Sequence, residues 1–232
     1  MTTAFILAAL IGQEPAAFDQ KVPGTAATLK MVPVPGGTIN SQGKEVEVKP
    51  FFISATEVTW DIYDVFVFRL DLNQTEQARG VDAKSRPSRP YGAPDHGFGH
   101  KGYPAIGPHS NSAVALAAWM AKKTGKKYRL LTEAEWEHAA TLGGGVPTSF
   151  AEHSWMWDTA KDTTHPVGKL KANSLGVFDM FGNVAEWVLA ADGTPVVKGG
   201  HYLSQAGDIS VSFRQPYQPE WQQKDAQMPK SK

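Results

Sequence analysis

The sequence predicts an α+β domain with few helices, short strands and much irregular loop. Three observations support this fold class. Short runs alternate polar and apolar residues, which is typical of half-buried strands. Only three segments combine apolar residues at helical spacing with capping signals. The chain also contains 22 glycines, 16 prolines and seven tryptophans, which indicates a loop-rich fold held by aromatic anchors rather than a helical bundle.

The composition excludes several classes of protein. At 232 residues, roughly 70% of the unfolded surface can leave water, which is enough for one substantial core. A hydrophobic content of 41% excludes a disordered chain. The formal net charge of +0 gives no basic field for nucleic acid or anionic lipid. Because Cys is absent, disulfides, thiolate metal sites, iron–sulfur clusters and cysteine nucleophiles are excluded.

The N-terminus carries an apolar run at residues 4–11 that is too short to span a bilayer. Its length suits the apolar part of a signal peptide, although no Lys or Arg precedes it. We interpret residues 1–13 as a signal peptide, which predicts an exported protein, periplasmic or secreted. The alternative is a strand or helix packed on the core of a cytoplasmic protein. Residues 14–30 are interpreted as a linker before a domain at 31–232, and no membrane span is expected.

The start of the domain predicts strands followed by a helix. Residues 32–39 are expected to form a strand entering a turn, and residues 44–48 and 51–54 two more strands in an antiparallel meander. Thr59 is expected to cap the first helix. The apolar face of that helix is expected to contain Ile62, Tyr63, Phe66, Val67 and Leu70. The following residues, 73–107, lack periodicity and are interpreted as a long functional or mobile loop.

Two further helices are predicted. Ser110 or Asn111 is expected to cap the second, which ends at Gly125. After a short strand at 128–131, Thr132 and Glu135 have the spacing of a capping box for the third helix. Beyond residue 145 only short strands and turns are expected.

Three sequence blocks, in this order, resemble the formylglycine-generating enzyme (sulfatase-modifying factor) family. They lie at residues 128–140, 173–188 and 197–202, and the segments 57–59, 103–106 and 213–214 fit the same pattern. The resemblance covers roughly residues 31–217. It implies a variant of the C-type-lectin-like fold, with short strands and long ordered loops.

The resemblance also implies a copper centre held by two cysteines, and here the chain departs from the family. The first cysteine position is Ser204, and the second falls near Ile209. A serine hydroxyl is a poor ligand for copper(I), and isoleucine offers no ligand atom. We therefore predict no copper and no formylglycine-generating activity by the copper mechanism.

The ergothioneine-synthesis oxygenases of the wider family carry iron on a His-x-x-x-His-x-Glu motif in a helix. His96 and His100 have the first spacing, but Gly102 stands where the Glu is needed. Two glycines between the histidines also disfavour a helix. We interpret both histidines as solvent-facing loop residues.

The resemblance implies one structural calcium site. Its ligands would be the side chains of Asp179 and Glu186 and the backbone carbonyls of Gly182 and Val184. Calcium prefers six to eight hard oxygen ligands, and these groups supply several of them. The alternative is that Asp179 and Asn183 only satisfy N–H groups of a turn, while Glu186 is a surface charge.

Family members place substrate-facing residues where this chain has a candidate binding face: Trp157, His201, Tyr202, Ser204 and Gln205. Ser204 does not lie in a Gly-x-Ser-x-Gly elbow, so the Ser/His pair does not indicate a hydrolase. Trp136 and Trp187 are interpreted as core anchors. Arg214 is expected to form a partly buried ion pair.

The leading functional hypothesis is a sulfatase-modifying-factor-like domain without catalysis, which binds an unknown small ligand or protein. One alternative is an oxidoreductase of the wider family that uses a different metal or oxidant. Another is an accessory subunit of a sulfatase or other exported enzyme. Several titratable residues converging at residues 201–205 would favour an enzyme, whereas Ser, Gln and aromatic residues alone would favour binding.

Overall fold

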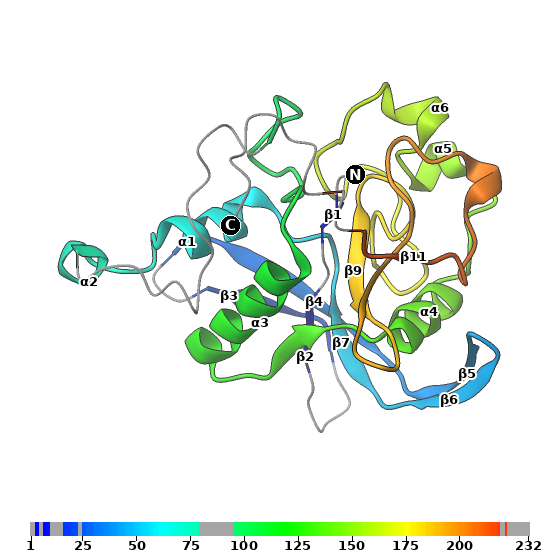
Figure 1. The fold of residues 1–232 in the computed structure, drawn as a ribbon, viewed down its shortest axis with the longest axis horizontal. Helices are drawn as coiled ribbons and strands as arrows, with labels where there is room; N and C mark the ends of the chain where they lie inside the picture. Colours follow the sequence, from blue (N-terminus) through cyan, green and yellow to red (C-terminus); the bar gives the residue numbers. More distant parts are fainter. Residues whose placement is uncertain are drawn as a thin grey trace.

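The structure is a computed structural model that describes residues 3–4, 7–9, 16–22, 25–78, 95–218 and 221. It is a mixed α+β fold, as predicted (Figure 1). The helices are α1 (Trp60–Phe68), α2 (Gln74–Ala78), α3 (Ser110–Thr124), α4 (Glu133–Leu142), α5 (Phe150–His153) and α6 (Trp157–Ala160), with a 3₁₀ turn η1 (Ala206–Asp208). The strands are β1 (Thr3–Ala4), β2 (Leu7–Ala9), β3 (Phe18–Lys21), β4 (Thr28–Val34), β5 (Gly37–Ser41), β6 (Lys44–Val48), β7 (Phe51–Ser54), β8 (Tyr128–Leu130), β9 (Ala185–Leu189), β10 (Pro195–Lys198) and β11 (Gln215–Pro216).

The described strands form three sheets. The largest has the order β3-β4-β7-β2-β8, a second has the order β1-β9-β10-β11, and β5 and β6 form a separate hairpin. The pairs are antiparallel except for β1 with β9. The expected meander is therefore wrong in one respect, because β7 pairs with β4 rather than with β6. All four residues of β7 are buried while β6 is largely exposed, so β7 belongs in a sheet covered on both faces.

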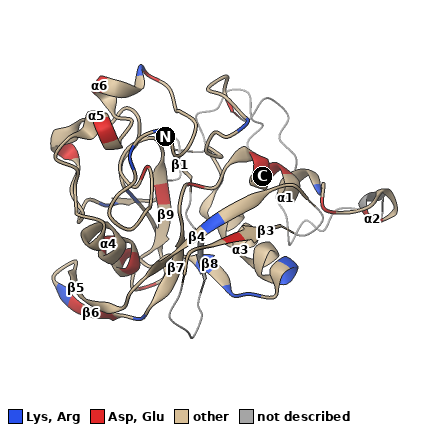
Figure 2. Cartoon of the chain, turned by 180° about the vertical axis from the view of Figure 1, so that it is seen from behind, with Lys and Arg blue, Asp and Glu red and all other residues tan. Residues whose placement is uncertain are grey.

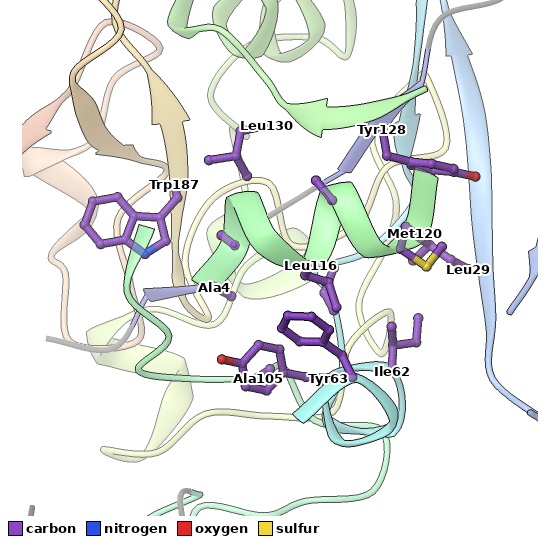
Figure 3. Close-up of a cluster of buried hydrophobic side chains, with 14 of the residues drawn as sticks. Ala4, Leu29, Ile62, Tyr63, Ala105, Leu116, Met120, Tyr128, Leu130 and Trp187 are labelled. Atoms are coloured by element: carbon purple, nitrogen blue, oxygen red, sulfur yellow. The ribbon is translucent and has the colours of Figure 1, made fainter. Parts of the chain in front are cut away.

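Two hydrophobic clusters cover the two faces of the five-stranded sheet, because neighbouring residues of a strand point to opposite sides. Met31 of β4 and Phe52 of β7 pack into the cluster that contains α1 and α3. Val32 and Ile53, one residue further along each strand, pack into the cluster that contains α4. Figure 3 shows the first cluster, in which Leu116 and Met120 of α3 lie close to residues of α1 and the sheet.

The helix starts agree only in part with the capping signals. Thr132 accepts from Glu135 N and forms the predicted capping box with its side chain. Thr59 precedes α1 but makes no side-chain cap hydrogen bond, so that expectation is wrong. At α3 the cap is His109, whose ring Nδ1 accepts from Asn111 N at 3.0 Å, rather than Ser110 or Asn111. Leu70 lies beyond α1 and is 57% exposed, which corrects its expected place in the core.

The N-terminal segment is built into the sheets. β1 pairs with β9, and β2 lies between β7 and β8. The structure thus contains the alternative left open by the sequence, a strand packed on the core, and removal of residues 1–13 as a signal peptide stays a prediction. Strand β3 and the first residues of β4 occupy part of the expected linker at 14–30. β1 and β2 pair with strands that are distant in sequence, whereas β3 pairs with β4, the next strand along the chain.

Acidic and basic positions are interspersed over the fold rather than gathered on one side (Figure 2). Among the described residues, no helix has both the length and the apolar character needed to cross a bilayer. This finding agrees with the expectation of no membrane span.

Candidate functional site

The predicted calcium segment folds as a tight turn that leads into β9. Asp179, Gly182 and Asn183 have left-handed backbones, with φ of 54°, 83° and 48°. At Gly182 a Cβ would collide with the carbonyl oxygen of Trp155, so glycine is required there. Asn183 is locked into the turn, since its side-chain oxygen accepts from His165 N at 2.9 Å and its own N–H donates to Trp155 O at 2.8 Å.

Three buried carboxyl groups meet at this turn. Asp179 and Glu186 are 3% and 1% exposed, and Glu57, which follows β7, is fully buried. Asp179 Oδ2 accepts from Gly168 N at 2.7 Å, and Glu186 Oε2 accepts from the Trp136 indole at 2.7 Å. The alternative interpretation of Glu186 as a surface charge is therefore wrong. Trp136 is a core residue, as predicted, and it also orients an acid.

Burial and mutual repulsion raise the pKa values of these carboxyl groups and so favour their protonated forms. Burial raises the pKa of Asp179 to about 6. Burial raises the pKa of Glu186 well above its ordinary value, and the charge of Asp179 adds to this. Burial raises the pKa of Glu57 in the same way, with further contributions from Asp179 and Glu186. A cation between them would offset both the desolvation and the repulsion.

The residues present fit a calcium ion. The second oxygens, Asp179 Oδ1 and Glu186 Oε1, are buried and have no hydrogen-bond partner among the described residues. Buried unpartnered carboxylate oxygens are costly, and a hard cation would satisfy them. Within the described part of the chain, no three His, Cys, Asp or Glu side chains form a metal-binding group by themselves. A calcium ion here would therefore also draw on the Gly182 and Val184 carbonyls and on water.

The two positions that carry cysteines in the family lie beside one glycine. A Cβ on Gly200 would lie 3.1 Å from Ser204 Oγ and would collide with Ile209 Cδ1. The structure thus brings together Ser204 and Ile209, as two ligands of one metal would require. Ser204 Oγ is already used as an acceptor for His201 N at 3.0 Å, and Ile209 is 8% exposed. These two positions therefore offer a hydroxyl and an aliphatic side chain.

The candidate binding face shares Ser204 with this pair of residues. Trp157 N donates to Ser204 O at 3.1 Å, which joins α6 to the 201–205 segment. Trp157 is 53% exposed and Leu203 is 38% exposed, while Tyr202 is buried and packs edge-on against Phe98. Gln205 is exposed and precedes η1. The face therefore presents the exposed side chains of Trp157, Leu203 and Gln205.

His201 is the histidine of this face, and its ring makes no contact with a carboxylate among the described residues. Its Nδ1 accepts from Leu203 N at 3.2 Å, so a neutral ring carries its proton on Nε2. Burial lowers the pKa of His201, which favours that neutral form. Within residues 201–205, the titratable side chains are His201 and Tyr202.

A buried ion-pair network lies behind the two glycines at residues 199–200. Lys198 has no exposed surface, and its ammonium contacts Glu137 at 2.6 Å and Glu133 at 3.4 Å. Arg214 contacts Glu133 at 3.4 Å and is 35% exposed, which confirms its expected ion pair. These contacts join α4 to β10.

The two loop histidines differ in their surroundings. His96 is exposed, as predicted. For His100 the prediction of a solvent-facing loop residue is wrong, because its Nε2 lies 2.7 Å from Asp64 and its Nδ1 lies 2.9 Å from Asp95. Its ring also stacks on Trp60, with centroids 5.1 Å apart and planes 9° apart. His100 is therefore a bridge between α1 and the 95–104 loop.

Comparison with known families decides the identity of the domain. The family described as the sulfatase-modifying factor enzyme 1-like domain matches residues 18–226. The chain belongs to this family. The match begins before residue 31, where the sequence analysis placed the start of the domain, and takes in β3.

Curated relatives of this sulfatase-modifying-factor-like domain carry different names. Chaperone protein LppX of Paenibacillus barcinonensis is 33% identical over 119 residues, which cover 37% of this chain and 42% of LppX. Formylglycine-generating enzyme of Mycobacterium tuberculosis is 33% identical over 118 residues, which cover 42% of this chain and 37% of that enzyme. The chain thus spans less than half the length of these relatives.

Solved structures share the fold over most of the chain. Treponema denticola variable protein 1 has a TM-score of 0.65 at 20% identity, covering 88% of this chain and 94% of its own. PvdO from Pseudomonas aeruginosa has a TM-score of 0.64 at 25% identity, covering 90% and 94%. The predicted α+β architecture of the family is confirmed, while the relation to C-type lectins stays a prediction.

Sequence reasoning missed parts of the acidic cluster. Glu57 was noted only as part of the 57–59 block, and its place beside Asn183 and Val184 was not foreseen.

Proposed function

We propose that this chain is a sulfatase-modifying-factor-like binding domain that does not generate formylglycine. The observation that carries the proposal is the pair Ser204 and Ile209 beside Gly200, where copper-binding cysteines would be needed. No cysteine elsewhere in the 232 residues can replace them. The family scaffold is thus retained while its redox position holds no ligand for copper.

The face above this position supports binding rather than catalysis. Trp157 and Leu203 expose apolar surface, and a half-buried aromatic next to polar groups is the composition of many recognition sites. Among the described residues, His201 has no carboxylate partner that would make it a general base. One relative is named a chaperone protein, and a protein partner for this domain is in line with that name.

Calcium has a structural role in this proposal. Asp179, Glu186 and the carbonyls of Gly182 and Val184 would hold the ion, which would satisfy the two unpartnered carboxylate oxygens. The ion would stiffen the turn that precedes β9 and take no part in chemistry.

An activity assay tests the catalytic half of the proposal. The purified protein is incubated with a cysteine-containing sulfatase peptide, with and without copper, and the peptide mass is followed. We expect unmodified cysteine throughout, because no thiolate is available to hold copper(I). Robust turnover to formylglycine by the wild-type chain would refute the proposal.

A peptide-display selection tests the binding half. Peptides selected on the wild-type protein are re-measured on Trp157→Ala and on Leu142→Ala, a control that removes another exposed apolar side chain, on α4. We expect Trp157→Ala to weaken binding about tenfold or more, as for an interface hot spot, while Leu142→Ala leaves it unchanged. If both variants bind the peptides with equal affinity, the face around Trp157 is not the peptide-binding site.

A further inference from the structure

Glu57 is a buried carboxylate to which neither the sequence analysis nor the comparisons assign a role. It has no exposed surface and lies between β7 and α1. The backbone around it is fixed, since Ala55 O accepts from Phe178 N at 2.8 Å and Val58 O accepts from Ala105 N at 2.8 Å. A rigid main chain therefore delivers this carboxylate to a defined place.

That place is the turn expected to hold calcium. Glu57 Oε1 accepts from Val184 N at 3.4 Å, and Oε2 accepts from the Asn183 side-chain amide at 3.3 Å. On the other side, the Asn183 carbonyl accepts from Tyr202 N at 2.9 Å. The peptide unit between Asn183 and Val184 is thus held at both ends, by Glu57 and by the backbone of the binding face.

A peptide unit fixed in this way also fixes its neighbours. The flanking carbonyls belong to Gly182 and Val184, which are the backbone ligands expected for calcium. We propose that Glu57 is the positioning residue of this cation site: it holds the peptide between Asn183 and Val184 so that the flanking carbonyls face the ion. This inference rests on the calcium part of the proposed function.

A carboxylate suits this position better than an amide. Asn183 cannot rotate its side chain freely, because its oxygen accepts from His165 N and its amide group also donates to His165 O at 3.2 Å. It therefore presents an N–H to residue 57, and Val184 presents another. Glu57→Gln keeps one acceptor oxygen and turns an NH₂ group toward one of these donors, whereas Glu57→Ala removes both acceptors.

Terbium luminescence provides a test that does not depend on activity. Tb³⁺ takes calcium sites, and Trp136, whose indole donates to Glu186, lies where it can sensitise the ion. Affinity is measured by titration and by competition with Ca²⁺, and luminescence lifetimes in H₂O and D₂O report the bound waters. The matched control is Glu137→Gln, which alters another buried carboxylate, 2% exposed and paired with Lys198.

We expect Glu57→Gln to lower calcium affinity about 10- to 100-fold, the usual effect of losing a partner that orients metal ligands. Glu57→Ala should lower it further, and both should increase the number of bound waters as a carbonyl leaves the ion. Glu137→Gln should leave affinity and hydration unchanged. If Glu57→Ala does not fold, the affinity and hydration of Glu57→Gln alone test the role of Glu57.

The outcomes separate the two ideas. A wild-type protein that binds neither Tb³⁺ nor Ca²⁺ would remove the calcium site and this inference with it. Wild-type binding that both Glu57 variants reproduce, in affinity and in hydration, would overturn the role of Glu57 and leave the calcium site standing. Equal weakening by Glu57→Gln and Glu137→Gln would also overturn it, because the effect would then be general destabilisation.

Discussion

Two carboxylate oxygens in this molecule, Asp179 Oδ1 and Glu186 Oε1, are buried without a partner among the described residues. Hydrogen bonds from Gly168 and Trp136 satisfy only the other oxygen of each group. Such atoms either take a proton, a water or a cation, or they destabilise the fold. The pKa values of both groups are raised for the same reason, because burial disfavours the charged carboxylate.

Calcium should therefore stabilise the protein. At free calcium a hundred times the dissociation constant, the free energy of unfolding should rise by about 2.7 kcal/mol. The measurement is a thermal melt with chelator, calcium or magnesium, and magnesium should substitute poorly because it demands a smaller octahedral shell. Asp179→Ala and Glu186→Ala should each remove most of the calcium dependence. Identical wild-type melts after verified metal removal would contradict the site.

His100 predicts a pH effect at a second place. Burial alone would lower the pKa of His100, but the hydrogen bonds and charges of Asp64 and Asp95 outweigh it and raise the net value above 6.5. The stability that this bridge contributes is therefore fully present below about pH 6.5 and is lost as pH rises through the folded-state pKa.

An NMR titration of the His100 ring checks this prediction. We expect a pKa above the 6.5 of an ordinary histidine, and a lower value in Asp64→Asn and in Asp95→Asn. A His100 titration that neither Asp variant shifts would show that the ion pairs do not form in solution.

At the scale of single elements, α4 is the helix whose start the sequence predicts completely. Thr132 and Glu135 form both bonds of the capping box, and Glu135 also pairs with Arg129 at 2.6 Å. Thr132→Ala should lower the free energy of unfolding by about 1 kcal/mol, because an N–H at the helix start loses its acceptor. Thr132→Ser, which keeps the hydroxyl, is the control in chemical denaturation. Equal losses for both variants would contradict the cap.

Elements governed by local pattern were predictable, and those governed by distant partners were not. The alternation at residues 44–48 and the capping box identify β6 and α4 correctly. Strands β1 and β2 escaped prediction because their partner strands, β9 for β1 and β7 and β8 for β2, lie far away in sequence. The His109 cap was missed because a histidine ring is an unusual acceptor at a helix start.

The candidate site likewise contains residues that could be predicted from the sequence and one that could not. Asp179 and Glu186 were predicted from a resemblance, and the structure places both in one buried cluster. Glu57 lies 126 residues from Asn183 in sequence, so no local pattern could reveal that they meet. The fold alone brings them together.

At the scale of the whole molecule, the five-stranded sheet has cores on both faces and depends on its N-terminal strand. Ala8 in β2 pairs with Ile53 on one side and Arg129 on the other. A protein that begins at residue 14 would lack β1 and β2 and expose the edges of β7 and β8.

Truncation at residue 14 should therefore lower the melting temperature strongly and promote aggregation. Ala8→Pro should act in the same direction, since proline cannot donate to a ladder inside a sheet. Mass spectrometry of protein from the native host shows which N-terminus is present. A truncated protein that melts like the full chain would contradict a structural role for β2 and favour the signal-peptide interpretation.

The central place of β2 also sets an order of events during synthesis. The ribosome releases β2 before either of its neighbours, because β2 ends at Ala9, β7 begins at Phe51, and β8 follows only after α3. Until residue 130 has emerged, the edge of β2 that pairs with β8 has no partner strand. β2 is therefore synthesised before its partner strands, but its pairing in the sheet is completed only when β8 has been made. Until then its free edge is open to pairing with other strands, which is a route to aggregation.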